Sequence, residues 1–137
     1  MQVIIHKNRF GGVSLCIPTG ELPIEAVLAK DAPANSEARV VDYDSLPNQD
    51  KDFFGAWEMD ATSVTVNLTK AKDITKNRLR AERTPLLQAQ DVAFQRALEE
   101  GADTTAIVAE KQRLRNITQL ADQATSLEQL RSIKAAV

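Results

Sequence analysis

Apolar residues recur every seven positions between residues 79 and 121, and this repeat limits the possible folds more than any other feature of the chain. Before Gly101 the repeat places Leu79 and Leu86 on one side of a helix about six turns long. After Gly101 a second repeat begins, with Asp103 positioned to cap the N-terminus of another helix. The pattern therefore predicts two helices that fold back on each other as an antiparallel hairpin.

This apolar stripe is broader than the seam along which two helices meet. A hairpin of two helices would therefore leave part of the stripe uncovered, and we expect a third surface from the N-terminal part of the chain, from another copy or from a partner. The stripe continues across Pro85, which predicts a kinked helix rather than two separate ones. Its residues are Leu79, Leu86, Leu87, Ala93, Phe94 and Leu98 on the first helix and Ile107, Val108, Leu114, Ile117, Leu120 and Ala121 on the second.

Length and charge suggest how the chain is divided. Its 137 residues allow one ordinary domain, or a small head with a helical extension. Residues 1–67 carry five basic and ten acidic side chains, whereas residues 68–137 carry twelve and nine. We therefore predict an α+β fold in which a small antiparallel β/α head, residues 1–67, is followed by a helical hairpin and a short terminal helix, residues 68–137.

Short alternating segments in the head predict an antiparallel sheet with one helix. Residues 3–5 and 13–17 have the pattern of two strands, and the turn at Gly11-Gly12 joins them. Pro23 is well placed to open a short helix. Further strands are expected at residues 38–43 and 63–66.

The head also contains a group of aromatic residues. Phe53, Phe54 and Trp57 are three of the six aromatic residues of the chain. Because large aromatic side chains dominate small cores, we expect these three to cover the sheet and the base of the long helix. The alternative interpretation makes Trp57 an exposed residue that docks a partner.

The end of the chain carries the pattern of a short amphipathic helix. Thr125 and Glu128 have the spacing of a capping box, which predicts a helix start at this point. The apolar side chains that follow would share one face of this helix, and that face needs a place to dock. They are Leu127, Leu130 and Ile133.

Residues that commonly carry catalysis or bind metals are few and scattered. His6 is the only histidine and Cys16 the only cysteine, whereas a metal site needs three or four ligands at characteristic spacings. Ser14 lacks the motif of a catalytic nucleophile, and Gly11-Gly12 lacks the third glycine and the following helix of a phosphate-binding loop. We therefore expect no metal, no cofactor and no enzymatic activity. The acidic residues of the head are expected to form a solvated surface.

A run of basic residues occupies the first part of the long helix. Six Lys and Arg side chains lie between residues 70 and 83, against only Asp73 and Glu82. No aromatic residue lies among them to stack on a base, and no nucleic-acid-binding motif is present, so we expect no nucleic-acid partner. Arg78 and Arg83 are expected instead to reach carboxylates on a partner or on the second helix.

The remaining sequence features argue against export and membrane insertion. A single cysteine forms no internal disulfide, so the fold does not depend on an oxidising compartment. The apolar run within residues 1–8 is too short for the core of a signal peptide, and no run approaches the length of a membrane span. We expect synthesis in a cytoplasm and no membrane partner.

Three segments within the predicted helical part, residues 68–137, resemble small tail proteins of tailed bacteriophages. They are residues 78–87, the following Asp91, and Lys111-Gln112-Arg113-Leu114-Arg115 on the returning helix. Together they are similar to the motif of the phage tail assembly chaperone-like family. The residues at 46–47, 53–57 and 70–71 also resemble phage structural proteins, so the resemblance covers about residues 46–121. Val92 follows Asp91 where members of that family commonly carry a tryptophan.

The resemblance implies a non-enzymatic structural protein at the tail or tail fibre of a phage virion. Such a protein would act by self-association, as a homo-oligomer, and by docking to tail or fibre proteins; the alternative is a transient assembly chaperone for tail fibres. Nothing in the family implies a cofactor. The residues expected to contact a partner are Arg78, Leu79, Arg83, Leu86, Leu87, Phe94 and Leu98 of the long helix, with Trp57 of the head.

Overall fold

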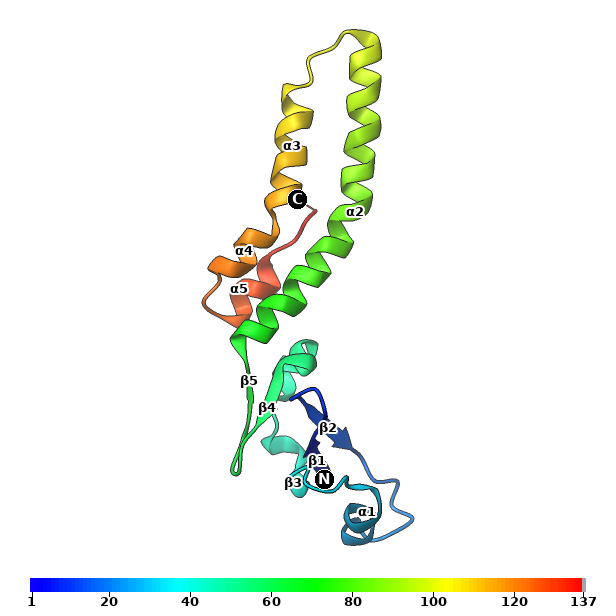
Figure 1. Cartoon of the computed structure of the whole chain (residues 1–137), viewed down its shortest axis with the longest axis vertical. Coiled ribbons are helices and arrows are strands. Elements are labelled where there is room, and N and C mark those ends of the chain that lie inside the picture. Colours follow the sequence, from blue (N-terminus) through cyan, green and yellow to red (C-terminus); the bar gives the residue numbers. More distant parts are fainter. Residues whose placement is uncertain (137) are drawn as a thin grey trace. The chain divides into compact units, whose positions relative to one another are not determined.

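The computed structural model describes residues 1–136 and has the predicted α+β fold, with strands first and helices after them (Figure 1). The chain divides into two compact units, Met1–Lys70 and Ala71–Val137. We call them the N-terminal unit and the helical unit. The predicted boundary, between residues 67 and 68, lies three residues earlier, at the first residue of the long helix.

A three-stranded antiparallel sheet forms the first half of the N-terminal unit. Its strands are β1 (Gln2–Lys7), β2 (Val13–Cys16) and β3 (Arg39–Asp42), with β1 in the centre. The predicted glycine turn joins β1 to β2, and α1 (Ile24–Asp31) connects β2 to β3. The three predicted strands and the helix that follows Pro23 are therefore confirmed.

A second, two-stranded sheet follows two 3-10 segments. These segments are η1 (Tyr43–Ser45) and η2 (Asn48–Ala56), and the sheet pairs β4 (Trp57–Met59) with β5 (Val64–Val66). Only β5 was expected from the sequence. β4 has the same length and also alternates, with Glu58 between Trp57 and Met59, but Trp57 was interpreted together with the aromatic residues that precede it. Asp60 closes the turn between them by accepting hydrogen bonds from Thr62 N and Ser63 N, which lower its pKa to about 2.

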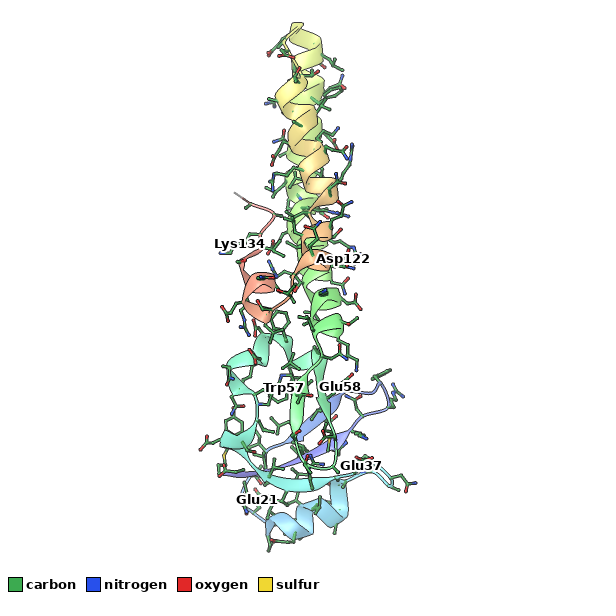
Figure 2. All side chains as sticks on the ribbon, turned by 90° about the vertical axis from the view of Figure 1, so that its left-hand side faces the viewer. Glu21, Glu37, Trp57, Glu58, Asp122 and Lys134 are labelled. Carbon is green, nitrogen blue, oxygen red and sulfur yellow. The ribbon has the colours of Figure 1, made fainter. Side chains whose placement is uncertain are left out.

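Trp57 lies at the centre of the core of the N-terminal unit. Its side chain has no exposed surface, and Nε1 donates to the carbonyl oxygen of Asp50 at 3.2 Å. Glu58, the next residue, points to the other side of β4 and pairs with Lys70 (Figure 2). The expected role of Trp57 as a core residue is correct, and its role as an exposed docking residue is wrong. The core around it comprises Val3, Ile5, Val13, Leu46 and Met59.

The helical unit is built on one long helix, α2 (Leu68–Glu100). This helix continues through Pro85 without interruption, and its axis changes direction about halfway along its length (Figure 1). Pro85 has no amide hydrogen to donate to the preceding turn, which accounts for a bend at this place. Within residues 1–136 no helix is both long enough and apolar enough to cross a membrane.

Three shorter helices complete the helical unit. They are α3 (Thr105–Asn116), α4 (Thr118–Gln123) and α5 (Leu127–Ser132). The sequence had predicted a single returning helix, but the chain bends at Ile117 and divides it into α3 and α4. The predicted terminal helix is α5. Its cap lies one residue later than expected, because Ser126 rather than Thr125 accepts the hydrogen bond from Gln129 N.

Candidate interaction site on the helical unit

The side chain of Arg78 on α2 binds the C-terminal segment of the same chain. Its Nη2 donates to the carbonyl oxygens of Leu130 and Ile133, at 3.1 and 2.7 Å. Its Nη1 donates to Glu82 Oε1 at 2.7 Å, one helical turn further along α2. Arg78 therefore uses its planar fork to join α2 to the end of α5, where helix carbonyls lack partners within the helix.

Ala135 is bound through both of its backbone groups. Its N–H donates to Glu82 Oε2 at 3.2 Å, and its carbonyl oxygen accepts from Arg113 Nη2 of α3 at 2.8 Å. Arg113 is itself held by a two-pronged pairing with Glu110, at 2.9 and 2.7 Å. The side chain of Ala135 has no exposed surface. We call Arg78, Glu82 and Arg113 the C-terminal clasp.

The charges of the clasp are mutually stabilised. The hydrogen bond from Arg78, followed by that from Ala135 N, lowers the pKa of Glu82 below its ordinary value of 4.5. The hydrogen bond from Arg113 lowers the pKa of Glu110, and the same bond raises the pKa of Arg113. Glu82, Glu110 and Arg113 are therefore charged at neutral pH, in the form that makes the strongest hydrogen bonds.

We expect acid to weaken the clasp. Because the pKa of Glu82 is lower in the folded chain than its ordinary 4.5, its contribution to stability is complete above that pH and is lost as the pH falls through the folded value. Glu82 is about one-third exposed, so this contribution is roughly 1 kcal/mol. Thermal unfolding between pH 6 and pH 2.5 measures it, and Glu82→Gln should flatten the dependence. An equally steep dependence in that variant would contradict the assignment.

Arg83 satisfies backbone groups at the bend between α3 and α4. Its Nη1 donates to the carbonyl oxygens of Arg115 and Leu114, at 2.9 and 3.4 Å. A bend in a helix leaves carbonyls of the last turn without their usual amide partners. Arg83 supplies those partners from α2. The prediction that Arg78 and Arg83 reach carboxylates on the second helix is wrong. Arg78 pairs with Glu82 on its own helix, and Arg83 binds carbonyl oxygens.

The third surface that the broad stripe requires comes from the chain's own terminal helix. Leu79 of α2, Leu114 of α3 and Leu130 of α5 are all fully buried, and Ile117 and Ala121 lie with them in the core of the unit. The expected sources of this surface were the N-terminal part of the chain, another copy or a partner. For the half of the hairpin that contains Leu79 and Leu114, the source is α5. Leu79 therefore has no surface with which to contact a partner.

The upper half of the hairpin has an apolar face that α5 does not cover. Lys111 of α3 pairs with Asp91 of α2 at 2.7 Å and lies over the Phe94 ring at 5.0 Å. Residues three, four or seven positions from Asp91 lie on its side of α2, and residues at the same distances from Lys111 lie on its side of α3. We call this surface the distal face. Its apolar residues that are not buried are Leu87, Phe94 and Leu98 on α2 and Ile107 and Val108 on α3.

The distal face and α5 lie on opposite sides of the hairpin. In Figure 2, where α3 lies in front of α2, α5 and Lys134 are on one side and Asp122 is on the other. Asp122 pairs with Lys76, which precedes Leu87 by about three helical turns and so shares its side of α2. The distal face therefore remains open while the C-terminal segment occupies the opposite side.

The predicted partner residues thus fall into four groups. Trp57 and Leu79 are core residues, and Arg78 and Arg83 bind backbone within the chain. Leu86 is half-buried and lies on α2 outside the distal face. The remaining predicted residues, Leu87, Phe94 and Leu98, belong to the distal face.

Sequence reasoning missed the clasp. Glu82 was noted as one of two acidic residues in the basic run, Arg113 as part of the motif at 111–115, and Ala135 had no predicted role. Asp91 and Lys111 were noted as motif residues without the prediction that they pair. The spacing of Arg78 and Glu82 by one helical turn was the available signal, but no local pattern connects them with Ala135.

Elsewhere the structure brings together few groups that support chemistry. His6, Cys16 and Asp31 border a cavity of about 20 Å³, which has room for one water molecule. Within the described part of the chain, no three His, Cys, Asp or Glu side chains meet as metal ligands would. No protein-family model matches this chain, and no curated protein or solved structure matches it either.

Proposed function

We propose that this protein is a non-enzymatic structural component of a phage virion, located at the tail or tail fibre. It acts by self-association and by docking to tail or fibre proteins through the distal face. The observation that carries the proposal is the exposure of this face: Leu98 is 54% exposed and Val108 is 50% exposed. Large apolar side chains that stay together on a surface are typical of protein interfaces.

The distal face has the pattern by which a helix is recognised in a groove. Leu87, Phe94 and Leu98 follow one another along one side of α2, as the anchors of an amphipathic helix do. Lys111 is only 15% exposed and is neutralised by Asp91, so burial of this region leaves no unpaired cation. The resemblance of residues 78–87, Asp91 and 111–115 to phage tail proteins supports the same assignment and supplies the tail as its location.

The proposal is tested by mass spectrometry of purified phage particles. We expect the wild-type chain at a constant ratio to the tail proteins, and the variant Leu98→Asp with Val108→Asp at less than a tenth of that ratio, because both changes place charge in the interface. The matched control is Val92→Asp with Leu120→Asp. These residues are 52% and 48% exposed and lie outside the distal face, so this variant should enter particles normally.

Two outcomes would contradict the proposal. If the wild-type chain is missing from particles but binds fibre proteins in infected cells, the protein is a transient chaperone. If both double variants enter particles as the wild type does, the distal face is not the docking surface.

A further inference from the structure

The segment held by the clasp contains its own helix cap and its own ion pair. The Ser126 side chain caps α5 by accepting from Gln129 N, and the Gln129 side chain accepts in turn from Thr125 N. Glu128 and Arg131 pair within the same helix. These interactions lie inside residues 125–132. The segment therefore keeps its own cap and ion pair when it leaves the hairpin.

The connection between α4 and α5 is short and extended. Ala124 has φ −68° and ψ 143°, and Ser126 has φ −147° and ψ 160°. Both conformations belong to the broad β region, which imposes no helical geometry across the joint. Rotation at these residues carries α5 away from its own hairpin without unwinding either helix. In domain swapping, identical chains exchange one element by rotation at a hinge of this kind.

The clasp recognises mainly the backbone of its occupant. It binds the carbonyl oxygens of Leu130, Ile133 and Ala135 and the amide of Ala135. Two side-chain features add selectivity: the fully buried Leu130, and a small residue at position 135. Its ligand class is therefore a short helix followed by a non-helical segment with a small residue at position 135, and a second copy of this chain presents that segment.

We propose that the clasp is an exchangeable binding site, in which residues 125–136 of one copy occupy the clasp of another. The contacts of the exchanged state are those of the closed chain, so the two states differ mainly in effective concentration. A tethered tail has an effective concentration on the order of millimolar, so exchange becomes significant where copies are crowded. This inference rests on the self-association in the proposed function and deepens it, because it assigns the contact between copies to the clasp, on the side of the hairpin opposite the distal face.

The test uses two full-length variants that are defective in complementary parts. In the first, Leu130→Asp with Ala135→Asp prevents the tail from docking but leaves the clasp intact. In the second, Arg78→Ala with Arg113→Ala disables the clasp but leaves the tail intact. Mixed at about 0.1–1 mM, the two should form a one-to-one complex in native mass spectrometry, whereas each alone should show at least tenfold less dimer. A mixture that remains monomeric would overturn the proposal.

A second measurement avoids substitutions in the protein. The wild-type chain, labelled for NMR, is titrated with a synthetic peptide of residues 124–136. We expect the signals of Leu130 and Ala135, which the peptide displaces from the clasp of the labelled chain, to shift at millimolar peptide, and a peptide carrying Ala135→Asp to cause at least tenfold smaller shifts. Absence of shifts with the wild-type peptide would overturn the proposal. The Leu98→Asp and Val108→Asp variant should give the wild-type result, which separates this test from that of the distal face.

Discussion

Replacing Trp57 with alanine should lower the free energy of unfolding of the N-terminal unit by about 3–5 kcal/mol. The indole is fully buried at the centre of the core. Its removal therefore leaves a cavity beside Val3, Ile5 and Met59. The carbonyl oxygen of Asp50 also loses the hydrogen bond from Nε1. A unit of this size is expected to have about 5–10 kcal/mol of stability in total. Urea unfolding followed by circular dichroism measures the loss.

Phe54→Ala is the control for this prediction. Phe54 belongs to the same aromatic group, and its ring lies 4.9 Å from that of Trp57, but it is 38% exposed. We expect a loss of no more than about 1–1.5 kcal/mol from the edge contact. If Trp57→Ala unfolded like the wild type and reduced entry into particles instead, Trp57 would be a docking residue after all.

The two aromatic positions show what the sequence could predict in this chain. The cluster of Phe53, Phe54 and Trp57 indicated an anchor, and the structure places Trp57 in the core with residues of β1 and β2. Local patterns also predicted the first three strands, the long helix and the terminal helix, because alternation and seven-residue repeats depend on neighbours in sequence. β4 was missed although it is as long as β5, because Trp57 was grouped with the aromatic residues before it rather than with Met59 after it.

Interactions between distant residues could not be predicted in the same way. The clasp joins Arg78 to Ile133 and Glu82 to Ala135, and these residues are brought together only when α5 folds back on α2. A backbone amide or carbonyl is present at every residue, so it gives no signal in the sequence. The sequence predicted that the stripe needs a third surface, and it contained the helix that supplies one. It did not show that this helix and this stripe belong together.

Replacing Leu79 with alanine should lower the free energy of unfolding of the helical unit by about 2–5 kcal/mol. Leu79 and Leu98 both belong to the apolar stripe of α2, and periodicity alone treats them alike. In the structure Leu79 has no exposed surface, whereas 54% of Leu98 is exposed. Truncating Leu79 therefore leaves a cavity among α2, α3 and α5. The variant should unfold at lower urea concentration but, below its transition, present an unchanged distal face.

Leu98→Ala is the matched control, since it removes the same atoms from the same helix. We expect its stability to remain within about 0.5 kcal/mol of the wild type, because the side chain already lies mostly in water. If the proposed function holds, its entry into particles should fall, because the removed atoms belong to the proposed docking surface. The two substitutions thus separate stability from docking. Should Leu79→Ala instead reduce docking at full stability, while Leu98→Ala destabilises the unit, the assignment of core and interface along α2 would be reversed.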